Sequence, residues 1–221
     1  MRRLFAMSLL AASALHAAPA RYASVRFDGF VTYPERLLVA RAGIRREGQS
    51  VIADTDAIAA VLAAERYIAW HSITAEKGNL VISITERKSA WRLLVPGSPS
   101  SLAELDTSLA VISSGTTYSD RPLLTALPAD VRDGRLGGRA AELLRRLERS
   151  ASGLSAFSQI AEIDLTDPFY VRIQFKGRKT LFTLAPARSS LIQVEALVGY
   201  FDASGRYPAT ARIEGASAVL G

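Results

Sequence analysis

Histidine and cysteine, the side chains most often used as catalytic bases, nucleophiles and metal ligands, are rare in this chain. Its 221 residues include two histidines, His16 and His71, and no cysteine, so disulfides, thiolate zinc sites and cysteine nucleophiles are excluded. His71 follows Trp70 in a strand pattern and has no second histidine beside it to share a metal. A Ser-His-Asp arrangement around His71 stays open, although no Gly-x-Ser-x-Gly elbow accompanies it. We therefore expect a surface or half-buried strand histidine.

Three carboxylates lie close together in the sequence, at Glu162, Asp164 and Asp167. Such a cluster could bind a cation or act as an acid-base pair. The same spacing is typical of a strand with one polar face that ends in an Asp-Pro turn. We favour the strand and the turn.

A glycine-rich segment, residues 134–138, precedes a helical pattern and invites comparison with phosphate-binding loops. It lacks their Lys-Ser/Thr ending and their spacing, so we expect a helix start capped by Asp133. The helix carries positive charge that could bind lipid or nucleic acid, at Arg135, Arg139, Arg145, Arg146 and Arg149. Glu142 and Glu148 interleave with these arginines, and Glu142 precedes Arg146 by the favourable four residues. A solvated helix face is therefore predicted, and no residue is assigned to catalysis, to a metal or to a cofactor.

The N-terminal residues of the chain indicate export, whereas its net charge does not. The formal net charge is +6, from 27 basic and 21 acidic residues, and two of the basic residues are Arg2 and Arg3. This excess suits anionic phospholipid headgroups, but it is equally that of an ordinary basic protein. Residues 4–15 are apolar and precede Ala18-Pro19-Ala20, a pattern typical of a secretory signal peptide. Residues 1–20 are therefore predicted to be a signal peptide, with a short uncleaved membrane anchor over residues 4–20 as the alternative.

Residues 21–95 predict a first domain with the order strand, helix, helix, strand, strand. Residues 25–28 alternate as a half-buried strand does, and a helix opens at the capping-box pattern of residues 32–35 and ends at Gly43. A second helix over residues 55–65, capped by Asp54 or Thr55, has an apolar face that a sheet must cover. Strands over residues 67–73 and 80–85, joined by a turn at residues 77–79, provide that sheet.

This pattern resembles a POTRA domain, the small periplasmic module of outer-membrane assembly proteins and of the FtsQ/DivIB cell-division proteins. The matching positions are Gly29 after the first strand, Ile44 and Gly48 between the helices, and Glu86-Arg87 after the last strand. Ser89 stands where the family often has a proline. The usual FtsQ cytoplasmic tail and longer transmembrane helix are also missing from the pattern.

Residues 96–221 predict a second domain, which begins after the turn-forming residues 95–101. We expect a strand at residues 109–112, an irregular connection at 123–128, and a helix at 136–150. An antiparallel meander follows over residues 158–165, 169–175 and 180–184, and then a helix that ends near Gly205. The last strand covers residues 210–213, with a continuation through 218–220. The order resembles the β domain of FtsQ, which gives an α+β fold overall.

The closing strand is the strongest candidate for function. Pro208 near its start cannot donate to a ladder and suits a sheet edge, where a partner could add a strand. The resemblance implies the same use, since the last strands of FtsQ proteins pair with an FtsB-type partner that is held with FtsL. By position it implies partner-binding residues at Tyr207, Thr210, Ala211, Arg212 and Ile213. The alternative is an edge covered by the tail, residues 214–221.

The resemblance thus implies a non-catalytic division scaffold at the periplasmic face of the cytoplasmic membrane. It implies no cofactor and no nucleic acid, and it leaves room for other division proteins that bind through the POTRA domain. Two alternatives remain: a periplasmic POTRA module that assists outer-membrane protein assembly, and a cell-envelope hydrolase.

Overall fold

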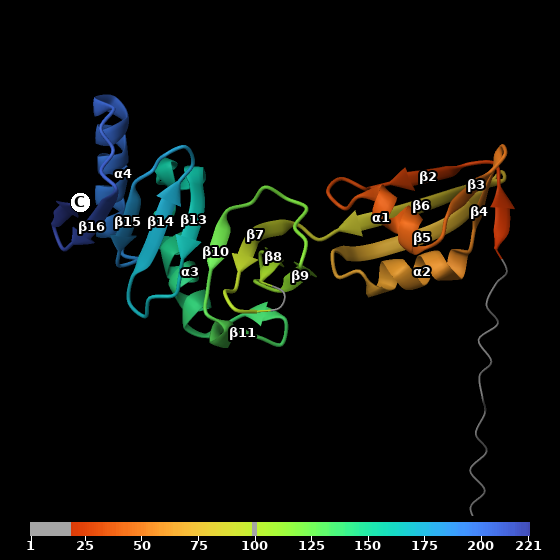
Figure 1. Cartoon of the computed structure of the whole chain (residues 1–221), viewed down its shortest axis with the longest axis horizontal. Helices are drawn as coiled ribbons and strands as arrows, with labels where there is room; N and C mark the ends of the chain where they lie inside the picture. The colour runs from red at the N-terminus through yellow and green to blue at the C-terminus, as the bar shows by residue number, and fades with distance from the viewer. Residues whose placement is uncertain (1–18, 99–100) are drawn as a thin grey trace, which may run out of the picture. The chain divides into compact units, whose positions relative to one another are not determined.

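The computed structural model describes residues 19–98 and 101–221, and the predicted leader lies almost wholly outside them. The chain divides into two compact units, residues 1–85 and 86–221 (Figure 1). Both units combine helices with sheets, which confirms the α+β class. Within residues 19–98 and 101–221, no helix has the length and the apolar character needed to cross a membrane.

The first unit contains two small sheets and two helices. Its elements are β1 (Ala20–Tyr22), β2 (Val25–Asp28), α1 (Glu35–Arg41), β3 (Arg45–Glu47), β4 (Ser50–Ala53), α2 (Thr55–Ala64), β5 (Ile68–Glu76) and β6 (Asn79–Glu86). One sheet has the order β2-β6-β5, with β2 parallel to β6, and the other has the order β1-β4-β3. The sequence patterns predict β2, both helices and the β5–β6 hairpin. They do not predict β1, β3 and β4, which are three or four residues long; β1 and β3 are largely exposed, whereas β4 buries Ile52 and Ala53.

Local capping explains where the helices of this unit begin and end. The Asp54 carboxylate accepts hydrogen bonds from the amides of Asp56 and Ala57 at 2.9 and 3.2 Å, so Asp54 is the predicted cap of α2. The capping box expected at residues 32–35 is wrong for α1, because the helix begins at Glu35 and its N-cap is Pro34, which has no side chain that could accept a hydrogen bond. It ends before Gly43, whose φ of +65° is the left-handed conformation that the sequence predicts.

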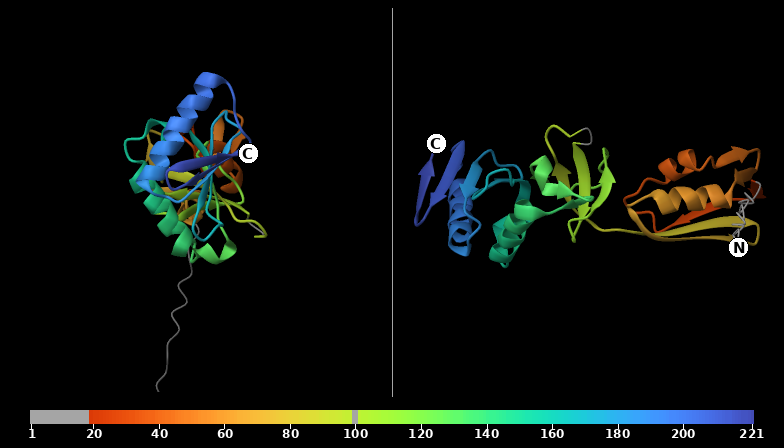
Figure 2. Two further views of the ribbon diagram at one scale, coloured as in Figure 1. Left: turned by 90° about the vertical axis from the view of Figure 1, so that its left-hand side faces the viewer. Right: turned by 90° about the horizontal axis from the view of Figure 1, so that it is seen from below.

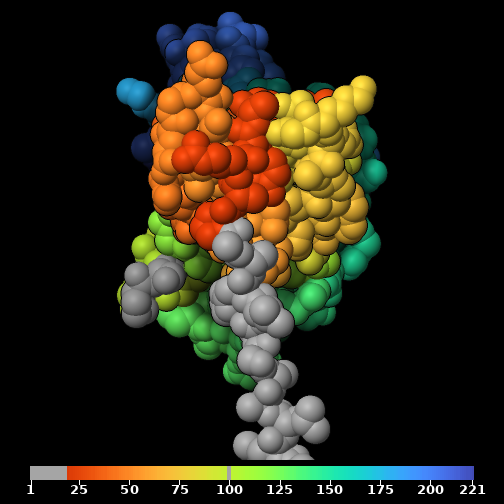
Figure 3. Space-filling model, turned by 90° about the vertical axis from the view of Figure 1, so that its right-hand side faces the viewer, coloured from red at the N-terminus to blue at the C-terminus, as the bar shows by residue number. Residues whose placement is uncertain are grey.

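The core of the first unit forms between α2 and the β2-β6-β5 sheet. Ile58 and Leu62 on α2 are buried, as are Leu80, Ile82 and Ile84 on β6. Gly29 passes so close to β6 that a Cβ atom there would overlap the carbonyl oxygen of Ile84. Figure 3 shows one face of this unit, where the earliest described residues, in red, lie between orange and yellow segments that follow them in the chain.

The second unit is built on a nine-stranded sheet. The strands of the whole unit are β7 (Ser89–Leu94), β8 (Leu102–Asp106), β9 (Val111–Ser114), β10 (Leu123–Thr125), β11 (Val131–Arg132), β12 (Arg135–Leu136), β13 (Ile160–Asp164), β14 (Val171–Phe175), β15 (Leu181–Leu184), β16 (Thr210–Glu214) and β17 (Ser217–Leu220). Its helices are α3 (Gly138–Ala151) and α4 (Arg188–Ser204), with 3-10 turns at Pro128–Asp130 and Ser155–Gln159. The sheet order is β17-β16-β15-β14-β13-β10-β7-β8-β9, and β11 and β12 form a separate hairpin.

One row of side chains crosses six strands and forms the centre of this core. Strand register places Leu93, Leu124, Ile163, Ile173, Phe182 and Ala211 side by side on one face. All six are buried. Helices α3 and α4 pack against each other and share this hydrophobic core, so both cover the same face of the sheet (Figure 2).

Several expectations about the second unit are confirmed and others are wrong. The β13–β14–β15 meander is antiparallel, and α4 ends at Gly205, which has a φ of +66°. The irregular connection expected at residues 123–128 contains β10, which pairs in parallel with both β7 and β13. Asp133 does not cap α3, because it lies in the β11–β12 turn and Gly137 is the N-cap.

The predicted domain boundary at residues 95–96 lies after β7, whereas the compact units meet between Thr85 and Glu86. Strand β7 belongs with the second unit because it pairs with β8 and β10. Turn-forming residues mark a loop in a sequence, but they do not say whether that loop joins two domains or two neighbouring strands.

Candidate partner-binding edge

The candidate residues lie where the chain returns from α4 to the sheet. The left-handed Gly205 ends α4, and residues 206–209 lead into β16. Pro208 lies in this connection rather than in the strand, and its carbonyl oxygen accepts a hydrogen bond from the Thr180 hydroxyl at 2.7 Å. The proline therefore positions the start of β16 without interrupting its ladder.

Strand β16 is not the edge of the sheet, so that part of the prediction is wrong. It pairs in parallel with β15 on one side and antiparallel with β17 on the other. The expected continuation through residues 218–220 is a separate strand, β17, which folds back after a turn at Gly215. The tail therefore covers β16, and the free edge moves one strand outward.

The five residues named by the resemblance have different environments. Ala211 and Ile213 are buried and belong to the core under α4, so they are unavailable to a partner. Thr210 and Arg212 are exposed on the opposite face. The Arg212 guanidinium lies 5.3 Å from the ring centre of Tyr170, and its Nε pairs with Glu214 at 2.9 Å.

Tyr207 is held by an ionic cluster at the end of α4. Its hydroxyl donates to the Asp202 carboxylate at 2.8 Å, and Arg178 donates to both oxygens of that carboxylate at 2.8 and 2.6 Å. The bonds from Arg178, and then the bond from Tyr207, lower the pKa of Asp202 from 3.8 to about 2. The cluster fixes the approach to β16 and leaves Tyr207 42% exposed.

The outer side of β17 offers unpaired backbone groups. Thr210 and Gly221 exchange two hydrogen bonds, of 2.9 and 3.0 Å, which sets the phase of the antiparallel ladder. In such a ladder every second residue points its amide and carbonyl away from the partner strand. For β17 these residues are Ala218 and Leu220, and no strand in the described part of the chain pairs with them.

The side chains of β17 also suit a sheet edge to which a partner strand can bind. The strand Ser-Ala-Val-Leu has no charge and no proline, and Val219 and Leu220 are 56% and 50% exposed. Leu220 lies opposite the buried Ala211, so it extends the core face of the sheet toward the solvent. Sheet edges of soluble proteins are usually protected by charges, prolines or bulges, and this edge has none of them.

The other residues singled out by type, Asp164, Asp167 and His71, lie in separate local settings. Asp164 accepts hydrogen bonds from Thr166 and pairs with Arg172 at 3.3 Å, while Asp167 accepts from two backbone amides of its own turn. These amide bonds lower the pKa of Asp167. His71 is half-buried on β5. Among residues 19–98 and 101–221, no three His, Cys, Asp or Glu side chains gather closely enough to hold a metal.

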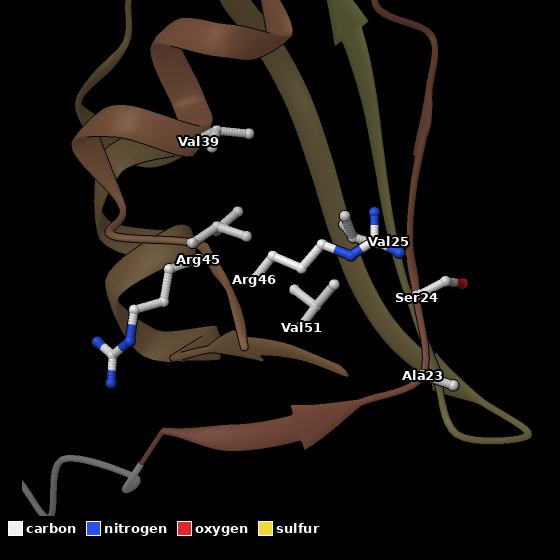
Figure 4. A pocket seen from close by; sticks show the side chains of 8 residues that line it. Ala23, Ser24, Val25, Val39, Arg45, Arg46 and Val51 are labelled. Carbon is white, nitrogen blue, oxygen red and sulfur yellow. The ribbon is translucent and has the colours of Figure 1, made fainter. Parts of the chain in front are cut away.

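A cavity of about 320 Å³ lies in the first unit between its two sheets (Figure 4). Its lining is mainly apolar and includes Val25, Val39 and Val51. The Arg46 side chain extends across it toward Val25, whereas Arg45 points away and pairs with Glu47 at 3.0 Å. The cavity could hold a small apolar group beside a guanidinium.

One buried polar cluster was missed by the sequence analysis. Glu104 on β8 is fully buried and accepts hydrogen bonds from the amides of Tyr118 and Ser119 and from two serine hydroxyls. The Ser119 hydroxyl lies 2.9 Å from that of Ser89, the residue that stands where the family often has a proline. A glutamate between Ala103 and Leu105 in an apolar strand is the signal that could have revealed this cluster. The cluster fastens the loop before β10 to the sheet.

Comparison with known proteins does not place this chain in a family. No family model matches it. No curated protein matches it either.

Proposed function

We propose that this protein is a non-catalytic cell-division scaffold of the FtsQ type, which binds an extended segment of an FtsB- or FtsL-type partner at the outer edge of β17. The observation that carries this proposal is the unprotected apolar edge of β17, at the end of a large sheet. A partner strand there would satisfy the outward backbone groups of Ala218 and Leu220. Its alternate apolar side chains would extend the core face next to Leu220.

Two further features support the proposal. In the first unit, β2 and the β5–β6 hairpin form a sheet in which β2 is parallel to β6, and two helices lie between them in the chain, in the order of the POTRA resemblance. In the second unit, a meander, a helix and closing strands follow each other in the order of the FtsQ β domain. The proposal places the body of the protein in the periplasm, with residues 4–20 as a signal peptide or as an anchor in the cytoplasmic membrane.

In-cell photocrosslinking from β17 tests this function. A photoreactive residue at Val219 should trap a small coiled-coil membrane protein of the FtsB or FtsL kind, and one at Ala59 on α2 should not. Trapping of nascent outer-membrane proteins would instead favour the assembly module. Crosslinks that form only from Ala59 would refute the β17 edge.

A proline variant separates edge pairing from folding. The amide of Ala218 points away from β16, so Ala218→Pro removes an outward donor and leaves the β16–β17 ladder intact. We expect it to weaken partner binding at least about tenfold, because one backbone hydrogen bond is lost and a second chain can no longer approach. Ala218→Val keeps the amide and should bind as the original protein does. Equal binding by both variants would refute strand addition.

A further inference from the structure

A hollow of about 660 Å³ in the second unit gathers four arginines from three elements. Arg132 lies on β11, Arg135 on β12, and Arg145 and Arg149 on α3. We call these four residues and the concave surface between them the arginine hollow. Its lining also contains two carboxylates, at Asp133 and Glu142, so positive charge is in excess.

The fold brings these four side chains together in a way that the sequence does not reveal. Arg132 and Arg135 are a cross-strand pair in the β11–β12 hairpin. Arg145 and Arg149 are four residues apart and therefore share one face of α3. The hairpin lies next to α3, so two pairs that are ten residues apart line one surface.

Two of the four guanidinium groups of the hollow are held by backbone carbonyl oxygens, and the other two, those of Arg145 and Arg149, are attracted by Glu148 on the same helix. Arg135 donates to the carbonyl oxygen of Ser108 at 2.7 Å, and the Nε of Arg132 donates to that of Ala129 at 3.2 Å. A carbonyl oxygen holds a guanidinium without cancelling its charge. None of the four forms an ion pair within the described residues, whereas other arginines of the chain do.

We propose that the arginine hollow binds the phosphate groups of anionic phospholipid headgroups. Arginine can donate two parallel hydrogen bonds to the oxygens of a phosphate, as it can to a carboxylate. All four side chains are exposed, so they do not form a closed cage that strips a single soluble ion of its water. Exposed guanidiniums instead suit a charged surface, where each contributes a modest attraction and the attractions add. This inference concerns a lipid and does not use the β17 edge.

Vesicle binding by residues 21–221, without the predicted apolar leader, tests the proposal. This protein should co-sediment with vesicles that contain phosphatidylglycerol but not with vesicles of phosphatidylcholine alone, and added salt should weaken the binding. Arg145→Glu should weaken it about 25-fold, because two units of charge change at roughly a factor of five each. Glu142→Gln should strengthen it about fivefold, a result that misfolding cannot produce.

Arg146→Glu is the matched control. It changes the net charge of the same helix by the same amount, but Arg146 does not line the hollow and points about 100° away from Arg145 around the helix. Its loss should therefore be at most about fivefold. Equal losses for Arg145→Glu and Arg146→Glu would overturn the hollow as the binding site.

Three other outcomes would also overturn the proposal. They are equal binding to both kinds of vesicle, binding of inorganic phosphate without binding of vesicles, and binding of a single-stranded oligonucleotide without binding of vesicles. Ala218→Pro should bind vesicles as the original chain does. A failure of the β17 proposal is therefore distinguishable from a failure of this one.

Discussion

Leu124 is the residue at which the structure departs furthest from the sequence analysis, and its replacement by alanine tests that departure. The side chain is fully buried at the centre of the nine-stranded sheet, between Leu93 on β7 and Ile163 on β13. If residues 123–128 formed an irregular surface connection, the same side chain would contribute little. A buried central strand and an irregular surface connection therefore predict very different losses in the free energy of unfolding for Leu124→Ala.

The expected cost follows from what the substitution removes. Three carbon atoms leave a fully buried site, which costs about 2.4 kcal/mol at about 0.8 kcal/mol for each carbon. A central strand held on both sides cannot move in to fill the space, so a cavity term is added. We expect a loss of about 3–5 kcal/mol in the free energy of unfolding of the second unit.

Urea unfolding of the full chain measures this loss. Trp91 packs against the core of the second unit, so a Trp70→Phe background makes tryptophan fluorescence report that unit alone. Leu127→Ala is the matched control, because Leu127 follows shortly after and is 42% exposed, and it should cost about 0.5 kcal/mol or less. A cost below about 1 kcal/mol for Leu124→Ala, or one equal to that of the control, would refute the central position of β10.

Three further predictions concern other parts of the chain. Gly29→Ala should unfold the first unit, because the added Cβ would overlap the backbone of β6. Gly48 has a similar φ but lies in open space, so Gly48→Ala should lower the free energy of unfolding by only about 1–2 kcal/mol. Thermal unfolding of both variants distinguishes the two effects. The depressed pKa of Asp202 stabilises the fold above its unfolded value of 3.8, and this contribution is lost as the pH falls from about 4 to about 2. Urea midpoints measured through that window should fall less for Asp202→Asn than for the original chain, and parallel curves would contradict the assignment. Glu104→Ala should cost at least about 2 kcal/mol in urea unfolding, because it leaves two loop amides without their acceptor, and a cost near zero would mean that water replaces the carboxylate.

The sequence by itself determined the elements whose signal is local. Helix α2 could be predicted with its Asp54 cap, and α4 with its Gly205 end, because capping and the 3.6-residue period act within one or two turns. The β13–β15 meander could be predicted because its strands are adjacent in sequence and joined by short turns.

Only the tertiary structure decided which segments become neighbours. Strand β10 has three residues, too few to show alternation, and it is a strand because β7 and β13 lie on either side of it. The sequence indicates that β17 continues β16, but the turn at Gly215 places β17 beside β16 instead. The free edge of the sheet is therefore β17, and four of the five predicted partner-binding residues lie on β16, away from that edge. The arginine hollow likewise joins a hairpin to a helix. Strand pairing and the clustering of charged side chains depend on distances in space between residues far apart in the chain. A local sequence pattern does not specify these distances.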